Sequence, residues 1–472
     1  MSTFKNCSLK NGLSVCLLFC LCLLFGTQVF GQNPLSPAGK FNVFLKGDAT
    51  FITNESEGPI AIGGNLTVAG NYQVSFISTG NFQVGGVPIG LLVNGSVNYQ
   101  SGVLQVNQGG YVKIGNCNGS TVWYQDPNGA TPPIRITPFN NSNSYNNPPY
   151  IQINTSATGF PGGTVSPSNN PVCQGSLIDF NDAFSTLSNN SNGLAGCQKN
   201  VNVTNANGDP SSFSGDVYIN DNGLGSGPRI LNITGSELNS ISGLTSKFTP
   251  SANNPLIINV STGASFNWDV KPNNTGGAMQ YIIWNFPNVT DLTISGSNTV
   301  DGSVLAPNAN VIKTNPANIQ GQLIAQSYNQ NGGEMHHYPF GGNVTPCGTV
   351  CVKPTPTVNS ATICDGESAT LTVSNCNSSV SWSNGSTSNS ITVNPSSTTD
   401  YTVTCGTGNC TGQAFVQRGG GSTAVAQSPA PTGRTSYNCG FAKLSLPDAQ
   451  KASIVSTSQS RRLVTCNPNR PP

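Results

Sequence analysis

The sequence predicts an all-β protein in which a parallel β-solenoid-like domain with one helix is followed by a small immunoglobulin-like β-sandwich. Three observations predict this class. Short apolar stretches alternate with Gly and Asn from residue 41 to about residue 340, and two late segments repeat each other. A shorter downstream stretch alternates apolar and polar residues around two cysteines and a tryptophan, as strands with one buried side do.

Residues 1–31 are typical of a secretory signal peptide. Lys5 and Lys10 precede the apolar run Leu13–Phe25, and small residues follow before Gln32. The run has roughly a dozen residues, whereas a spanning helix needs ~20. We therefore expect an exported chain that begins near Gln32, has no transmembrane segment after cleavage, and is secreted or held at the cell surface.

The composition argues against nucleic acid as a partner. The chain has 19 basic and 18 acidic residues, and only 8% of its residues are charged, against ~25% in typical soluble domains. A protein that follows phosphates needs a basic stripe, and the sequence shows none. The polar surface must instead come from Asn, Ser, Thr, Gly and Gln, which suits extracellular adhesive β-structure.

The first domain, residues 38–345, contains many short strand signals and one helix signal. The clearest strands lie within Pro59–Val68, Leu91–Val97, Leu256–Val260 and Tyr281–Phe286. Leu177, Phe180, Phe184 and Leu187 instead recur near helical spacing. With Ser176 as the N-cap, this spacing predicts a helix over Ser176–Ser188.

A near-repeat points to stacked coils. Gly302–Ala306 and Gly321–Ala325 share a Gly-x-apolar-apolar-Ala frame, and Gly64–Leu66 and Gly95–Val97 resemble it more weakly. A period near 20 residues fits one coil of a parallel β-solenoid, in which each turn stacks on the last. Coincidence within a Gly-rich conventional sandwich is the alternative that the sequence leaves open.

A hinge at residues 346–357 separates this domain from a compact module at residues 358–417. The module's strand signals are Ala369–Val373, Val380–Trp382, Ser390–Val393 and Tyr401–Thr404. The order Cys376, Trp382, Cys405 is typical of a small immunoglobulin-like sandwich. Residues 418–472 are rich in Gly, Ser and Pro and predict a flexible tail.

Cysteine usage predicts disulfides. Of the 15 cysteines, four lie in residues 1–31, which leaves an odd number, eleven. Export favours disulfides over a zinc site among Cys347–Cys410. A disulfide that closes a loop around the helix explains Cys173 and Cys197 more simply than an internal thioester. We expect Cys173 to pair with Cys197, Cys376 with Cys405, and Cys364 with Cys410. The disulfide candidates are Cys173, Cys197, Cys347, Cys351, Cys364, Cys410, Cys376 and Cys405.

Two resemblances follow from particular motifs. The first domain resembles the choice-of-anchor A family through Phe41–Gly47, Glu57–Gly64, Trp284–Val289, Asp301–Ala309, Ile319–Ala325 and Gly332–His336. The module is similar to immunoglobulin-like repeats of Bacteroidetes surface proteins through Ile363–Leu371, Trp382–Gly385 and Asp400–Cys405. The resemblance implies a secreted or surface-attached, adhesin-like bacterial protein, and it supplies no catalytic residues.

The chemistry-bearing residues favour structural roles. Glu334 and His336 are weak metal candidates, but His337 on the same strand must face the other side, so we expect hydrogen bonding and no metal or cofactor. Three carboxylate pairs suggest a hydrolase: Asp216 with Asp221, Asp179 with Asp182, and Glu55 with Glu57. Turns, caps and surface positions explain each pair, and Asn220–Gly223 fits a hairpin turn better than a calcium loop.

We therefore expect an adhesin-like or structural protein and not an enzyme. Its partner would be an unknown extracellular protein or glycan, held on a broad polar face. Two alternatives remain: a carbohydrate-binding or carbohydrate-cleaving solenoid protein, and an ice-binding protein. Ice binding needs flat ranks of Thr, and residues 302–325 show no such register.

Overall fold

The computed structural model describes residues 32–138, 142–314, 316–344 and 347 in the N-terminal part of the chain. Downstream it describes residues 356–359, 363–364, 368–376, 379–395, 399–407, 410–419 and 439–443. These residues form mostly β-strands with few helices, which confirms the all-β class. The predicted signal peptide and most of the predicted hinge lie outside the described residues.

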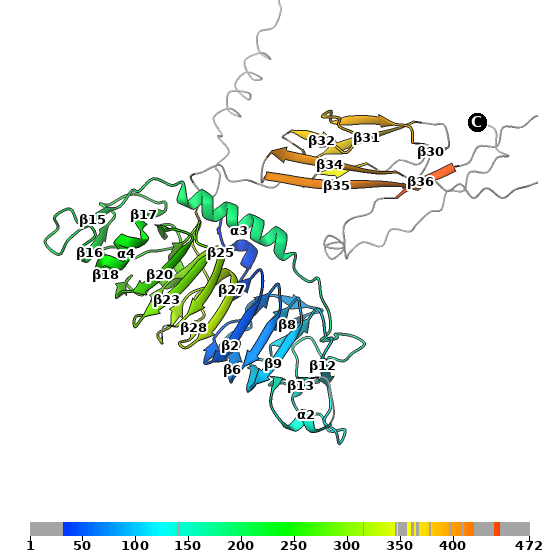
Figure 1. Ribbon diagram of the computed structural model, residues 1–472, viewed down its shortest axis with the longest axis horizontal. Coiled ribbons are helices and arrows are strands. Elements are labelled where there is room, and N and C mark those ends of the chain that lie inside the picture. Colours follow the sequence, from blue (N-terminus) through cyan, green and yellow to red (C-terminus); the bar gives the residue numbers. More distant parts are fainter. Residues whose placement is uncertain are drawn as a thin grey trace, which may run out of the picture.

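The first domain is a stack of mostly parallel strands with three sides (Figure 1). We call the first side the covered face. Its strands lie side by side in the order β11 (Tyr111–Ile114), β8 (Val87–Val93), β4 (Ile60–Ile62), β1 (Val43–Leu45), β27 (Leu323–Asn331), β25 (Ser303–Lys313), β22 (Ile282–Asn285), β19 (Leu256–Ser261), β17 (Arg229–Thr234). The second, the Asn/Thr face, contains β9 (Val97–Ser101), β5 (Leu66–Ala69), β2 (Ala49–Thr53), the C-terminal halves of β27 and β25, β23 (Asp291–Gly296) and β20 (Ser265–Val270).

The third side, the ladder face, contains β12 (Ser120–Trp123), β13 (Ile134–Pro138), β14 (Tyr150–Ile153), β10 (Val103–Val106), β6 (Tyr72–Val74), β3 (Glu55–Ser56), β28 (Met335–His336), β26 (Ile319–Gln320) and β24 (Val300–Asp301). A separate sheet has the order β15 (Asn202–Thr204), β16 (Gly215–Asn220), β18 (Ile241–Ser246), β21 (Asn273–Asn274), and β7 (Gln83–Val84) pairs with β8. The helical segments are η1 (Ser36–Ala38), α2 (Ser142–Asn146), α3 (Phe180–Ala195), α4 (Gly235–Ser240) and η2 (Met279–Tyr281).

The chain begins in the middle of the stack and not at an end. It runs outward from β1 to β11, then passes back along the covered face through α3 toward the other end, and returns from β17 to β27 (Figure 1). Val43 of β1 therefore pairs with Ile60 on one side and with Leu323 on the other. One hydrophobic core runs through both halves as a result.

The near-repeat in the sequence marks strands that lie side by side. Val304 pairs with Leu323 and Ala306 with Ala325, as the offset of the two Gly-x-apolar-apolar-Ala segments predicts. Leu66 also pairs with Val97, in the weaker echo. The number of residues per coil varies along the chain, so the sequence repeat can be recognised only where the coils are short.

The long helix differs from its predicted position. Asp179, not Ser176, is the N-cap: its carboxylate accepts the backbone N–H of Asp182 at 3.0 Å. Ser176 has a φ of +57°, whereas an N-cap residue has an extended backbone, so Ser176 does not cap the helix. The helix also continues seven residues beyond Ser188. Its 16 residues span ~24 Å, which equals about five strand spacings.

Aromatic and amide contacts fix α3 to the covered face. The Phe44 ring stacks against Phe180 and Phe184, with centroids 5.2 and 5.5 Å away. Farther along, Asn285 donates to the carbonyl of Ser191 and accepts the Ser191 hydroxyl. The amides of Asn285, Asn259 and Asn232 then link three neighbouring strands, each through a 2.9 Å hydrogen bond. The end of the helix is thus bonded directly to the stack.

The disulfides correct one predicted pairing. Cys173 is joined to Cys117 and Cys197 to Cys347, so the expected Cys173–Cys197 bond is wrong. The cause is α3, which carries Cys197 to the far end of the stack, away from Cys173. Cys376 is joined to Cys405, as predicted. The side chains of Cys364 and Cys410, and all of Cys351, lie outside the described residues.

His337 closes the seam between the first and last coils. Its Nδ1 lies 2.8 Å from Oδ1 of Asn42, its backbone N–H donates to Glu57, and Asn42 donates to the carbonyls of Gly321 and His336. Burial, and then the positive charge of Lys40, lower the pKa of His337 to about 4. The seam therefore holds a neutral imidazole at physiological pH.

Downstream, two further sheets form. One has the order β29 (Thr357–Val358), β31 (Ala369–Ser374), β33 (Ser390–Val393). The other has the order β30 (Ile363–Cys364), β36 (Cys439–Lys443), β35 (Cys410–Gly419), β34 (Asp400–Thr407), β32 (Val380–Trp382). Trp382 is buried with Leu371 and Val403 in a core separate from that of the stack. Strand β36 falls within the segment predicted as a flexible tail.

We predict that Asn285→Ala destabilises the fold by about 2–4 kcal/mol, because it leaves buried groups on Ser191 and Asn259 without partners. Chemical denaturation measures the free energy of unfolding. Asn192→Ala, at an exposed position of the same helix, is the control and should change it by less than about 0.5 kcal/mol. Equal effects at the two positions would contradict the role of the amide network.

A second prediction concerns the stability of the fold at acidic pH. The pKa of His337 is about 4 in the fold and about 6.5 in the unfolded chain. The unfolded state therefore binds the proton first, and stability falls as pH drops from about 6.5 to about 4, by at most about 3 kcal/mol. His337→Gln should lose less stability than the wild type between pH 7 and pH 4.5. His336→Gln is the control, and parallel pH profiles for the wild type and the His337 variant would refute the assignment.

Candidate binding face

The Asn/Thr face presents seven parallel strands whose inward side chains form the core. Phe51, Val68 and Tyr328 point inward and are fully buried. The residues between them point outward, as the two-residue period of a strand requires. Helix α3 packs on strands of the covered face and leaves this side open (Figure 1).

One outward residue from each strand lines up in a single rank across the face. The rank consists of Asn267, Thr293, Ile312, Asn329, Thr50, Thr67 and Asn98. Each residue stands directly opposite the next, so neighbours are ~4.8 Å apart and the rank is ~29 Å long. Ile312 supplies an apolar contact in its middle, with 46% of its surface exposed.

The polar groups of this rank are available to a ligand. Within the part of the chain that the structure describes, the side chains of Thr50, Thr67, Asn98, Thr293 and Asn329 make no hydrogen bond to the protein. Asn267 alone is engaged, through the Ser295 hydroxyl at 2.8 Å. A ligand on this face would not have to break internal hydrogen bonds at the other five positions.

The neighbouring row is used for structure. Ser327 donates to Asn310 at 2.8 Å, and Asp48 accepts the backbone N–H of Asn65 at 2.6 Å. The amide oxygen of Asn65 in turn accepts the backbone N–H of Ser96. These bonds hold the bends between the covered face and the Asn/Thr face.

The ladder face is also polar, but its side chains bond to one another. Gln73 donates to Glu55, Asn107 to Gln73, and Asn154 to Asn107. Arg135 continues the chain through Gln152. Burial, and then the charges of Glu334 and Glu57, raise the pKa of Glu55. Most of this face's hydrogen-bonding capacity is already used.

Glu334 and His336 lie together on the ladder face. His336 Nε2 is 3.2 Å from a Glu334 carboxylate oxygen and 2.9 Å from the Asn318 amide nitrogen. Glu57 is farther away, at 4.0 Å. Across the described residues no group of three or more His, Cys, Asp and Glu side chains is placed to hold a metal.

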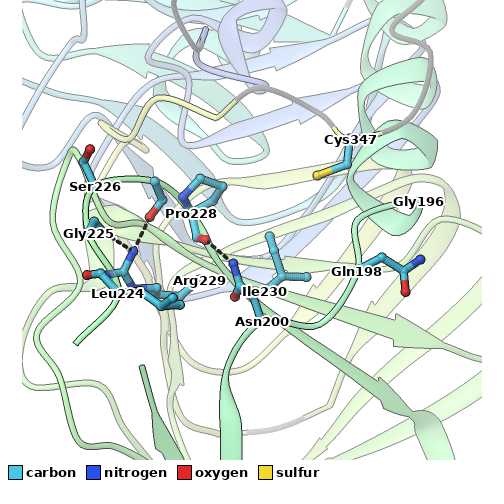
Figure 2. A pocket seen from close by; sticks show the side chains of 11 residues that line it. Gly196, Gln198, Asn200, Leu224, Gly225, Ser226, Pro228, Arg229, Ile230 and Cys347 are labelled. Atoms are coloured by element: carbon cyan, nitrogen blue, oxygen red, sulfur yellow. Dashed lines mark hydrogen bonds between the residues drawn. The ribbon is translucent and has the colours of Figure 1, made fainter. Parts of the chain in front are cut away.

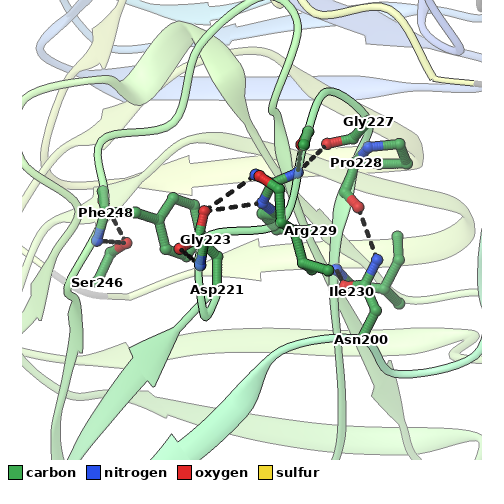
Figure 3. Close-up of polar contacts among 11 residues, drawn as sticks. Asn200, Asp221, Gly223, Gly227, Pro228, Arg229, Ile230, Ser246 and Phe248 are labelled. Carbon is green, nitrogen blue, oxygen red and sulfur yellow. Dashed lines mark hydrogen bonds and ion pairs between the residues drawn. The ribbon is translucent and has the colours of Figure 1, made fainter.

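In each carboxylate pair singled out in the sequence, at least one member has a structural partner. Asp179 caps α3, Glu55 accepts from Gln73, and Glu57 accepts the His337 N–H at 2.8 Å. Asp221 forms an ion pair with Arg229 at 3.0 Å (Figure 3). The predicted Asn220–Gly223 hairpin is wrong, because β16 pairs with β15 and β18 and not with the following strand. An Asx turn from Asp221 to Gly223 starts a longer loop.

Arg229 organises that loop from a buried position. Its side chain is only 2% exposed, and its guanidinium donates to the carbonyls of Leu224, Gly225 and Gly227 as well as to Asp221. A cavity of about 490 Å³ lies beside it, between this loop, the segment Gly196–Asn200 and Cys347 (Figure 2). Because the guanidinium is already bonded within the loop, it holds the backbone and presents no free charge to the cavity.

Sequence reasoning missed two buried lysines. Lys113 donates to Asn170, to the Pro171 carbonyl at 2.7 Å and to Gln174 at 2.7 Å. Lys313 donates to the carbonyls of Ala317 and Gly332. Burial lowers the pKa of both lysines to about 8. Their sequence contexts, Tyr111–Ile114 and Val311–Lys313, look like ordinary strands and give no signal of burial.

No helix among the described residues is long and apolar enough to cross a bilayer. A search of curated proteins found no match to the chain. A family model described as "Putative Ice-binding-like adhesive domain" matches residues 34–337, which is most of the stack and more than half of the chain. The match supports an adhesin-like domain in general, and with the disulfides it is compatible with an extracellular or surface protein. The chain belongs to this ice-binding-like adhesive domain family.

Proposed function

We propose that this is a secreted or surface-exposed adhesin-like protein that holds an extended extracellular glycan or protein on its Asn/Thr face. The observation that carries the proposal is the seven-residue rank, in which five polar side chains have no internal hydrogen bond. We further propose that residues 38–345 are a β-solenoid, that residues 358–417 are an immunoglobulin-like module, and that neither has catalytic activity. The resemblances to choice-of-anchor A proteins and to Bacteroidetes surface repeats support the surface location.

A regular rank suits a ligand that itself repeats. Single contacts to exposed Thr or Asn are weak, but several contacts along one polymer act together once the first has formed. The strands are fixed by the sheet, so the polar groups are already in place and little order is lost on binding. The low charge of the chain favours a neutral ligand over a strongly ionic one.

Ice is the second candidate, and the same rank supports it. The sequence shows no Thr register within residues 302–325, but the fold brings Thr50 and Thr67, on two paired strands, into one rank with Thr293 from a distant part of the sequence. The family description points the same way. Inhibition of ice recrystallisation distinguishes ice from an adhesive ligand.

The test uses the exported chain on arrays of glycans and extracellular matrix proteins, together with an ice recrystallisation assay. Thr50→Tyr with Thr67→Tyr places two bulky rings on the rank without disturbing the core. We expect at least ~10-fold weaker binding or ice activity, equivalent to about 1.4 kcal/mol. Thr370→Tyr, at an exposed strand position of the module, is the matched control. Undiminished activity in the double variant would exclude the Asn/Thr face as the binding site.

A further inference from the structure

The end of the stack at β17 and β20 carries two terminal strands. Among the strands that the structure describes, β17 pairs only with β19, and β20 only with β23. Each therefore has an outer edge on which backbone N–H and C=O groups point away from the stack. Such an edge is a template for another strand and is a common site of association.

The Asn239 side chain occupies this edge on β20. Its amide nitrogen donates to the carbonyl of Asn267 at 2.8 Å, and its amide oxygen accepts the backbone N–H of Asp269 at 3.1 Å. A residue on a neighbouring parallel strand would bond to the same two groups, one on each side of Trp268. The side-chain amide thus stands in for a peptide group of the next strand.

Asn200 repeats the arrangement on β17. Its amide nitrogen donates to the carbonyl of Pro228 at 2.9 Å, and its amide oxygen accepts the N–H of Ile230 at 2.7 Å (Figure 3). These two groups again flank one residue, Arg229. The backbone N–H of Asn200 adds a third bond, to the Ile230 carbonyl at 3.1 Å.

Both amides are held in place by their surroundings. Asn239 lies on α4, which a capping box between Thr234 and Glu237 fixes to the end of β17. Asn200 follows Cys197, which is joined to Cys347 and whose carbonyl accepts the Asn232 amide. Asn200 also lines the cavity beside the Arg229 loop (Figure 2).

We propose that Asn200 and Asn239 close this end of the stack against a second copy of the chain. The opposite end is covered only in part: the segment around Cys173 bridges to Ile114 of β11, whereas among the described strands β9 on the Asn/Thr face pairs only with β5. Without these amides, a second copy has two ways to pair: like edge with like edge, or head to tail between β20 and β9. Like-with-like pairing closes as a two-fold dimer, whereas head-to-tail pairing continues into longer assemblies.

The experiment compares two double variants of the full exported chain. Asn200→Ala with Asn239→Ala removes both amides and leaves neutral edges. Asn200→Lys with Asn239→Lys removes the same hydrogen bonds but places a charge on each edge, which opposes strand addition. Asn192→Ala, which changes an exposed residue of α3, is the control. Sedimentation velocity over a range of concentrations gives the mass of each protein.

We expect the alanine pair to shift to at least about twice the wild-type mass as concentration rises, while the lysine pair and the control remain at the wild-type mass. A monomeric alanine pair would overturn the proposal. Equal association of the alanine and lysine pairs would also overturn it, because unfolding and not edge pairing would then be the cause. If the double variants do not fold, the single pair Asn239→Ala and Asn239→Lys is judged by the same criteria.

Discussion

The structure depends on one constraint: every coil must supply hydrogen-bonding partners for the backbone of the coil beside it. Regular strands do this along the flat sides, and asparagine side chains do it where strands end or bend. Asn273 bonds to both the Thr299 carbonyl and the Asp301 N–H of the next coil, which is the arrangement seen for Asn200 and Asn239. The short, stiff amide offers one donor and one acceptor at nearly peptide spacing. The high Asn content is therefore part of the scaffold as well as of the surface.

The order in which the chain forms the stack has a second consequence: the first and last coils meet at a seam in the centre of the stack. Because β1 lies between β4 and β27, the first coil must fit two neighbours made from distant parts of the sequence. Asn42, Glu57 and His337 bond across this junction, and α3 spans both halves from the outside. Cys197 then joins the end of that helix to Cys347, just after the last coil. The two halves are consequently tied along the core, at the seam and along the helix.

Local features of this fold could be predicted from the sequence, and non-local ones could not. The strands, the pairing of Gly302–Ala306 with Gly321–Ala325 and the Cys376–Cys405 bond follow from short patterns. The order of the coils does not follow from short patterns, because no pattern in the sequence indicates that β1, which begins at residue 43, lies in the middle of the stack. That order decides which cysteines meet, which is why the Cys173–Cys197 expectation failed. It also decides that Thr50 lies between Asn329 and Thr67, so the rank was invisible to a search within one segment.

The contrast between the two uncovered faces explains why polarity alone did not locate a binding site. On the ladder face Glu55, Gln73 and Asn107 satisfy one another, and a ligand would have to replace bonds that already exist. On the Asn/Thr face the hydroxyls of Thr50 and Thr67 make no internal hydrogen bond within the described part of the chain, so a ligand has only water to replace there. Exchanging water for a ligand costs less than breaking an internal bond and leaving a partner unsatisfied. The proposed binding face is thus distinguished by what its side chains leave unbonded, a property that depends on the fold and not on the composition.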